Sequence, residues 1–260
     1  MTKIDYCYHT HTKRCGHATG EDEEYILKAI NLGLKALGFS DHAFLPGISQ
    51  HHSRGDFELF EDYLKSINSL KEKYKDKIDI KVGFEAEYSD RFIDYYKGLL
   101  QSKKLDYLIL GQHFDFDNTD RPTYIRQLHE DKAALDKYVK QVEAAINSGL
   151  FKYIAHPDIF ACMYNTWNKD CEEAARKICE MASTARIPLE VNCQLKIAYE
   201  RHSDAIIYPF DEFWKIASEY DVDVVIGYDS HRPIDFDYDI SFAYNIVKKY
   251  NLHLLTNFRI

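Results

Sequence analysis

Short runs of β-type residues alternate with longer stretches of helical period along the whole chain. The predicted strands cover residues 4–8, 36–39, 78–83, 107–110, 153–155, 188–191 and 222–226. The predicted helices cover residues 22–32, 57–74, 90–102, 131–148, 170–184, 210–219 and 235–250. Every strand is followed by a helix, a pattern typical of βα units around a parallel sheet.

The composition suits one large domain. The 260 residues are 45% hydrophobic with six prolines, enough to bury a full core, and no flexible linker divides them. We therefore treat residues 1–260 as a single domain. Lys and Arg number 33 against 42 Asp and Glu, a formal charge of −9 without a polybasic run, so nucleic acid is a poor candidate partner.

Residues able to bind a metal ion follow six of the seven predicted strands. His9 and His11 come after the first strand, where positions two residues apart share a face and would converge. The later strands are followed by Asp41 with His42, Glu85, His113, His156, and Asp229 with His231. In a parallel (β/α) barrel the carboxyl ends of all strands open onto one face, where active sites are built. We therefore expect these residues to meet there, together with His17.

The nature of these side chains favours a transition metal. Imidazole and carboxylate without thiolate suit Zn, Mn or Fe(II) better than Mg or Ca. Nine such groups exceed what one tetrahedral zinc takes, so two or three ions are expected, with Glu85 as the obvious bridge. One histidine alone would as readily be an ordinary hydrogen-bonded residue, and only the shared position at strand ends carries the prediction. The six cysteines, scattered without a CxxC pair, are interpreted as reduced thiols.

Four short motifs resemble, in order, those of the polymerase and histidinol phosphatase (PHP) superfamily. They are His9-Thr-His11 with His17 downstream, Ser40-Asp41-His42, His156-Pro157-Asp158, and Asp229-Ser-His231. The intervening pieces are Gly83-Phe-Glu85 and Gly111-Gln-His113-Phe114. The resemblance spans nearly the whole chain and is greatest to the monofunctional histidinol-phosphate phosphatases of the HisK type.

This resemblance implies a distorted (β/α)7 barrel of the TIM-like PHP type, with the active site at the carboxyl ends of the strands. It also implies three divalent transition-metal ions, zinc first, with Mn or Fe as alternatives. The ligands implied for the first ion are His9, His11, Glu85 and Asp229. Those implied for the second are Glu85, His113 and His156, and those for the third are His17, His42 and His231. Glu87, two residues beyond Glu85, leaves a second register open.

The implied activity is hydrolysis of L-histidinol phosphate to L-histidinol and phosphate, late in histidine biosynthesis. A metal-bridging hydroxide would attack phosphorus while the ions clamp the phosphate. The predicted catalytic residues are His42, Asp229 and Glu85. The proton for the leaving alkoxide could come from Asp229, a ligand imidazole or a bound water.

Substrate contacts are predicted from residue type. An arginine fork pairs two phosphate oxygens at once, and Arg14, between His11 and His17, is the first candidate. Further candidates follow the sixth predicted strand: Arg201, His202 and Lys196. His51 and His52 are possible additional contacts. The ammonium and imidazole of histidinol would suit an acidic wall, for which the candidates are Asp115, Asp117 and Glu190.

Two alternatives stay open. The same centre could act on another small phosphate ester or a nucleotide, although the negative charge argues against long nucleic acids. The chain could instead be a PHP module that binds metal without catalysis, and the complete set of ligands counts against this. With neither a leader peptide nor an apolar stretch of membrane length, we expect a cytoplasmic protein without membrane contact. The sequence does not reveal the oligomeric state.

Overall fold

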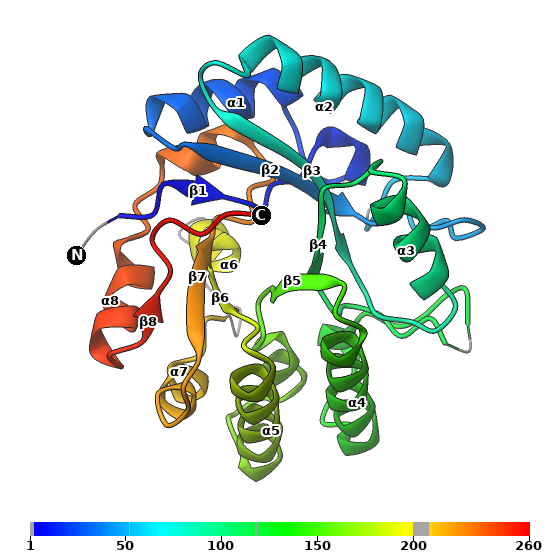
Figure 1. Ribbon diagram of the computed structural model, residues 1–260. Helices are drawn as coiled ribbons and strands as arrows, with labels where there is room; N and C mark the ends of the chain where they lie inside the picture. Colours follow the sequence, from blue (N-terminus) through cyan, green and yellow to red (C-terminus); the bar gives the residue numbers. More distant parts are fainter. Residues whose placement is uncertain (1–2, 52, 118, 200–207) are drawn as a thin grey trace.

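Eight parallel strands form the centre of the computed structural model, which describes residues 3–51, 53–117, 119–199 and 208–260 (Figure 1). The strands succeed one another across the sheet in chain order, each parallel to the next. Their bounds are β1 Tyr6–Cys7, β2 Ala36–His42, β3 Asp79–Ala86, β4 Tyr107–Leu110, β5 Phe151–Ile154, β6 Leu189–Asn192, β7 Asp223–Gly227 and β8 His253–Leu254. The sheet curls around an interior instead of lying flat (Figure 1).

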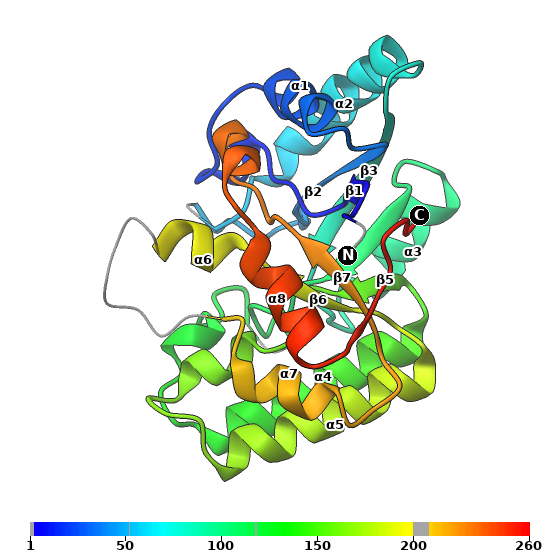
Figure 2. The same cartoon turned by 90° about the vertical axis from the view of Figure 1, so that its left-hand side faces the viewer.

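Helices surround the curled sheet on its outer side (Figures 1 and 2). The α-helices are α1 Asp22–Asn31, α2 Phe60–Tyr74, α3 Ile93–Gln101, α4 Lys132–Ser148, α5 Lys169–Ala185, α6 Gln194–Tyr199, α7 Asp211–Ala217 and α8 Ser241–Lys249. Short 3-10 helices are η1 Lys13–Cys15, η2 Phe57–Leu59, η3 Ile125–Gln127, η4 Ile159–Met163 and η5 Pro233–Asp237. None of the helices in the described ranges combines the length and apolar composition that crossing a bilayer requires.

The outer helices begin and end where their sequences provide caps. In α4 the Asp131 carboxylate accepts a 3.0 Å hydrogen bond from the Ala134 N–H, which satisfies a backbone donor at the helix start. Gly149 ends the helix at φ 67°, a left-handed conformation that glycine adopts without a Cβ clash. The buried face of the helix, including Leu135 and Val142, packs into the common core, so α4 is held by its apolar stripe.

The first and seventh strands meet at their carboxyl ends. Beyond β1 and β7, Thr10 and Ser230 form a parallel bridge. The His11 N–H donates to the Ser230 carbonyl over 2.8 Å, and the Ser230 N–H donates to the His9 carbonyl over 3.3 Å. At the other end of β7, Asp223 and Val224 pair instead with β8. The segments that follow β1 and β7 are therefore side by side where the predicted ligands begin.

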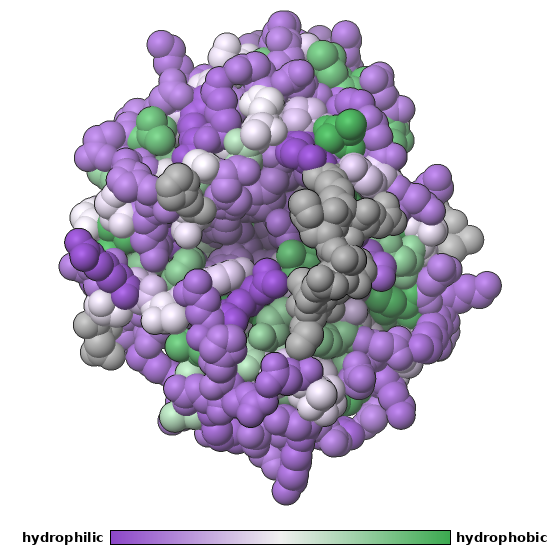
Figure 3. All heavy atoms as spheres, turned by 180° about the vertical axis from the view of Figure 1, so that it is seen from behind, coloured by the Kyte–Doolittle hydropathy of each residue, from purple (hydrophilic) through white to green (hydrophobic). Residues whose placement is uncertain are grey.

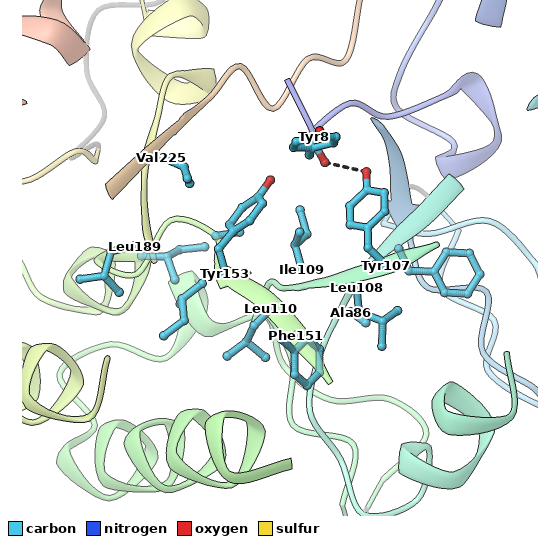
Figure 4. Close-up of a cluster of buried hydrophobic side chains, with 14 of the residues drawn as sticks. Tyr8, Ala86, Tyr107, Leu108, Ile109, Leu110, Phe151, Tyr153, Leu189 and Val225 are labelled. Atoms are coloured by element: carbon cyan, nitrogen blue, oxygen red, sulfur yellow. Dashed lines mark hydrogen bonds between the residues drawn. The ribbon is translucent and has the colours of Figure 1, made fainter. Parts of the chain in front are cut away.

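Tyrosine side chains fill much of the interior of the sheet. Tyr107 on β4 is buried, and its hydroxyl donates to the Tyr8 carbonyl over 2.8 Å and to the Phe39 carbonyl over 3.1 Å (Figure 4). One side chain thus links β4 to the first two strands. Gly38 and Gly83 leave the room it needs, since a Cβ on either residue would lie 2.2 Å or 2.4 Å from an atom of Tyr107.

The predicted parallel α/β barrel is confirmed, and all seven predicted strands are present with slightly shifted ends. The predicted helix over 57–74 is η2 followed by α2, and the one over 235–250 separates into η5 and α8. The sequence did not predict β8 or α6. These elements have two and six residues, too few for a period to show.

Replacing Gly38 by alanine should lower the free energy of unfolding by about 1–3 kcal/mol, because overpacking a filled core forces neighbours from their preferred positions. Urea denaturation followed by circular dichroism measures this quantity. Gly98→Ala is the matched control: Gly98 is exposed on α3, and a Cβ there would meet no atom within 4 Å. The control should be neutral or stabilising by up to about 1 kcal/mol. Equal effects of the two changes would contradict the packing described for Tyr107.

Candidate metal centre

All nine residues predicted as ligands lie together at the carboxyl ends of the strands. His42 is the last residue of β2, and Glu85 lies in β3. The others occupy the segments that follow β1, η1, β4, β5 and β7. Most of the set is buried, and His17 is the exposed member. The curled parallel sheet therefore gathers residues from both ends of the sequence.

The residues predicted for the first ion face one another in the interior. The His11 Nε2 atom lies 3.1 Å from Asp229 Oδ1 and 3.4 Å from Glu85 Oε2. The His9 Nε2 atom lies 3.4 Å from Asp229 Oδ1 and 3.5 Å from Glu85 Oε1. Two imidazoles and two carboxylates thus aim their ligand atoms at a common point.

The residues predicted for the second ion lie on the other side of Glu85. Its Oε1 atom is 2.7 Å from His156 Nε2 and 3.4 Å from His113 Nε2. The two histidine nitrogens are 3.1 Å apart. Glu85 therefore offers an oxygen atom to two neighbouring groups of ligands, as a bridging carboxylate does.

The residues predicted for the third ion include two histidines whose tautomers are fixed by the backbone. His17 Nδ1 lies 3.1 Å from the Cys15 carbonyl, and His231 Nδ1 lies 3.0 Å from the Asp229 carbonyl. Since a carbonyl only accepts, each Nδ1 donates its hydrogen, and each Nε2 keeps a lone pair. The two Nε2 atoms face each other at 2.9 Å. Two lone pairs so close repel unless a cation lies between them, which fits a metal ion.

His42 connects this third group with the rest of the centre. Its Nδ1 atom lies 3.0 Å from Glu85 Oε2, and its ring centroid is 5.4 Å from that of His17. The residues around Glu85 and those around His17 therefore form one continuous cluster.

Buried atoms without partners support a metal centre. Among the described residues, His9 Nε2, His11 Nε2 and Asp229 Oδ1 are buried and find no hydrogen-bond partner. Buried polar groups are rarely left unpaired, because an unmet hydrogen bond in the interior costs about 1–3 kcal/mol. These three atoms belong to the group predicted for the first ion, and a cation would satisfy all of them.

The protonation states also fit. Desolvation within the cluster and a neighbouring imidazole lower the pKa of His17 and of His231 to about 4, although the His17 side chain is partly accessible, so both imidazoles are neutral near pH 7. Burial opposes the charge on Glu85, but the imidazoles of His113, His9 and His42 hold its pKa well below the ordinary value. Neutral imidazole and ionised carboxylate are the forms that bind divalent ions. Burial opposes a charge on His9 and on His113, but the surrounding carboxylates raise the pKa of both, so these two imidazoles would release a proton when an ion binds.

Gly111 makes room for the central carboxylate. It follows β4, next to Glu85 on β3, and a Cβ at this position would lie 2.1 Å from Glu85 Oε1. Any side chain at position 111 would push the carboxylate away from His113 and His156.

Of the two registers left open by the sequence, the structure puts Glu85 at the centre and Glu87 behind it. Glu87 Oε1 lies 3.4 Å from His113 Nδ1 and accepts a 2.8 Å hydrogen bond from Arg54 Nη2. Both partners of this ion pair are buried. Glu87 therefore lies behind a predicted ligand, on the side where carboxylates next to metal-bound histidines are commonly found.

Two of the predicted ligands have strained backbones. His156 has φ 29° and Asp229 has φ 49°, a region that residues other than glycine seldom occupy. Such conformations cost of order 1–3 kcal/mol and persist where the surroundings enforce them, often at functional sites.

A cavity of about 490 Å³ opens over the cluster. Figure 3 shows the molecule hollowed on this face, with hydrophilic residues around the hollow. The lining includes ligand side chains together with Gln50, His51, Phe114, Tyr124, Arg126, Gln194 and Tyr208. The ligand atoms are thus accessible to a small molecule from one side.

The predicted phosphate ligand Arg14 does not line this cavity. Its guanidinium is buried and pairs with Asp22 over 2.9 Å and Asp62 over 2.8 Å. Because this guanidinium is buried, paired with two carboxylates and outside the cavity lining, we do not retain Arg14 as a phosphate ligand. Lys196 is exposed on α6 outside the lining. The predicted contacts Arg201 and His202, and also His52, lie outside the described residues.

The acidic residues predicted to receive histidinol also lie elsewhere. Asp115 lines a neighbouring cavity, where it pairs with Lys137 and accepts from Gln141. Asp117 accepts from Ser89 and does not line the cavity over the cluster. Glu190 is fully buried beneath the cluster, where it contacts His9 and not solvent.

Arg126 is the cavity residue that sequence reasoning missed. Within the described ranges it is the one Lys or Arg side chain that lines the cavity, where Tyr124 of the same connection also lies. The Tyr124 ring lies 6.0 Å from that of His113, and the Tyr208 ring lies 5.6 Å from that of His156. Arg126 follows a long connection without periodicity, and only the position of this loop over the cavity identifies it.

Comparisons with known proteins give a consistent result. The chain matches the PHP domain family over residues 8–194. A Deinococcus radiodurans protein named probable histidinol-phosphatase is 29% identical over 234 residues, which covers 86% of this chain and 85% of that protein. A histidinol-phosphatase of Lactococcus lactis is 25% identical, with 99% and 95% covered.

Two solved structures share the fold. A candidate histidinol phosphatase, HisK, of Listeria monocytogenes has a TM-score of 0.70 at 23% identity, with 91% of this chain and 99% of that chain covered. HisK of Lactococcus lactis, solved with zinc, L-histidinol and phosphate, has a TM-score of 0.69 at 19% identity, with 99% and 97% covered.

Replacing Gly111 by alanine should weaken zinc binding by at least about 10-fold, because the new methyl group would displace the Glu85 carboxylate. Elemental analysis after gel filtration, and competition with a chromogenic chelator, measure the zinc retained. Gly98→Ala, which adds the same methyl group on an exposed helix face, should keep the zinc content of the unmodified chain. A Gly111→Ala variant with unchanged zinc affinity would show that Glu85 does not bind the metal.

Proposed function

The chain belongs to the PHP domain family, and we propose that it is a metal-dependent phosphomonoesterase that hydrolyses L-histidinol phosphate to L-histidinol and phosphate. The observation that carries this proposal is the complete cluster of nine ligand residues beneath an open cavity. Two relatives that cover most of the chain are named for this activity, which supports the choice of substrate. The activity would belong to histidine biosynthesis.

We propose three divalent ions, zinc first, in the three ligand groups described above. The first group is His9, His11, Glu85 and Asp229, the second is Glu85, His113 and His156, and the third is His17, His42 and His231. Divalent ions held there would activate water as the nucleophile and offset the charge of the phosphoryl oxygens. Glu85 keeps the groups together, and Asp229, His42 and His231 line the cavity, where a proton for the leaving alkoxide is needed.

Arg126 would bind the phosphate within the cavity that it lines together with the predicted ligands. Its guanidinium is permanently charged and offers a planar pair of donors to phosphate oxygens. No carboxylate within the described residues forms an ion pair with it, and its side chain lines the cavity beside Tyr124. Arg126 thereby takes the role that the sequence assigned to Arg14.

Aromatic side chains would receive the rest of the substrate. Phe114, Tyr124 and Tyr208 line the same cavity as Arg126. Their rings can stack on an imidazole and attract an ammonium group through cation–π contact, worth about 0.5–2 kcal/mol. A cavity with this lining would suit the cationic amino alcohol better than an acidic wall formed by Asp115 or Asp117.

We place this activity in the cytoplasm and in a single domain of residues 1–260, without nucleic acid or membrane as partner. The formal charge of −9 supports the absence of nucleic acid, since phosphate backbones are bound by Lys and Arg.

Phosphate release from L-histidinol phosphate, p-nitrophenyl phosphate and AMP would test the proposed function directly. With zinc counted by elemental analysis, we expect kcat/KM for L-histidinol phosphate to exceed the other two by about 10³-fold or more. Weak and similar hydrolysis of all three esters by fully metallated protein would retain the phosphoesterase and reject this substrate. Metallated protein without turnover on any ester would favour a module that binds metal without catalysis.

Replacing Arg126 by glutamine should lower kcat/KM for L-histidinol phosphate by about 10–100-fold, because a charged hydrogen bond to phosphate contributes about 1.5–3 kcal/mol. Arg126→Lys should retain part of the activity, since it keeps the charge and loses the planar fork. Arg121→Gln, an exposed arginine of the same connection, is the control and should stay within about 2-fold of the unmodified chain. Steady-state kinetics compare the variants. Unchanged kinetics of Arg126→Gln would remove Arg126 from the proposed site.

A further inference from the structure

β6 is the one predicted strand that no predicted metal ligand follows, yet it carries a fully buried carboxylate next to the centre. We infer that Glu190, with Asn192, is a positioning residue that fixes three of the ligands, and this inference rests on the metal centre of the proposed function. Both residues belong to β6, two positions apart, and are fully or almost fully buried. Their contacts reach ligands that follow three other strands.

The first contact fixes His9. Its Nδ1 atom lies 2.9 Å from Glu190 Oε1 and 3.1 Å from Glu190 Oε2. An ionised carboxylate only accepts, so Nδ1 carries the hydrogen and donates it. In the neutral ring, the form that binds a metal, the Nε2 atom then keeps its lone pair, which faces Glu85 and Asp229. Glu190 thus selects the tautomer and the ring orientation that a metal ligand at this position needs.

The second contact fixes the backbone of His156. Its N–H donates to Glu190 Oε2 over 3.1 Å. His156 is one of the two strained ligand positions, with φ 29°. A hydrogen bond to a buried charge is stronger than one between neutral groups, so Glu190 contributes to holding this conformation.

Asn192 extends the same network to Asp229. Its Oδ1 atom accepts from the Gln194 N–H over 2.9 Å, which orients the amide. The Nδ2 group then donates to Glu190 Oε2 over 2.8 Å and to Asp229 Oδ2 over 3.1 Å. Asp229, the other strained position with φ 49°, therefore presents Oδ1 to His9 and His11.

Two further observations indicate that the fold provides a defined place for the Glu190 side chain. Gly227 on β7 leaves space for it, because a Cβ there would lie 1.8 Å from Glu190 Oε1. Moreover, within the ranges that the structure describes, no Lys or Arg pairs with this fully buried carboxylate. Buried charges are stable only when paired or close to a metal. A cation bound through His9 would supply the missing positive charge, so Glu190 and a metal ion stabilise each other.

Zinc affinity of Glu190→Gln tests this role without substrate. Glutamine keeps the size of the side chain and removes the charge, so we expect zinc binding in the first group to weaken about 10–100-fold. Competition of the apoprotein with a chromogenic chelator measures affinity, and turnover should return at saturating zinc. Asp158→Asn is the matched control: it also removes a buried carboxylate at this end of the barrel, but Asp158 accepts from the Phe210 N–H and from no ligand side chain. The control should stay within about 2-fold of the unmodified chain.

A second measurement needs no variant. In zinc-loaded protein with ¹⁵N-labelled histidine, long-range ¹H–¹⁵N spectra should show His9 protonated at Nδ1 and coordinated through Nε2. Coordination through Nδ1, or equal zinc affinity of Glu190→Gln and the unmodified chain, would overturn the inference alone. An unmodified chain that binds no zinc would overturn the metal centre as well.

Discussion

The buried carboxylate of Glu85 is the interaction on which the rest of the site depends. An isolated negative charge in a protein interior is strongly unfavourable. Here five imidazoles lie within 3.5 Å of its two oxygens, from His9, His11, His42, His113 and His156. These five imidazoles can surround Glu85 only if the carboxyl ends of β1, β2, β4 and β5 lie close to the carboxyl end of β3. The burial of this charge therefore depends on the curl of the parallel sheet, which brings the imidazoles around it.

Much of this arrangement follows from local signals in the sequence. Each βα unit carries its own alternation of strand and helix, and parallel connectivity then brings all strand ends to one face. Because His9, Glu85 and Asp229 each follow or end an apolar run, their meeting could be predicted without knowing the curvature of the sheet. The resemblance to the PHP family supplied the barrel itself, and the structure brings the predicted ligands together at its carboxyl end.

Some residues were given a wrong role or were missed because their positions depend on contacts between distant segments. Arg14 was chosen for its place between two histidines, but Asp22 and Asp62, on α1 and α2, take its guanidinium. Arg126 lies in an irregular connection, and no periodicity indicates that this loop returns over the cavity. Glu190 looked like a possible pocket wall, since apolar and polar residues alternate along β6 and predict one exposed face, whereas all four residues of the strand are buried. Local periodicity in the sequence does not predict which side chains contact one another across the barrel.

The bridge between Thr10 and Ser230 also bears on the order in which the molecule folds. It joins segments from opposite ends of the sequence, and such contacts form late because a long loop must first be closed. His9 and His11 lie on the first of these two segments, and Asp229 lies on the second. The residues predicted to bind the first ion therefore come together only when these two segments have paired. A bound ion would hold the two segments together and slow their separation. The metal would thereby lengthen the lifetime of the folded state.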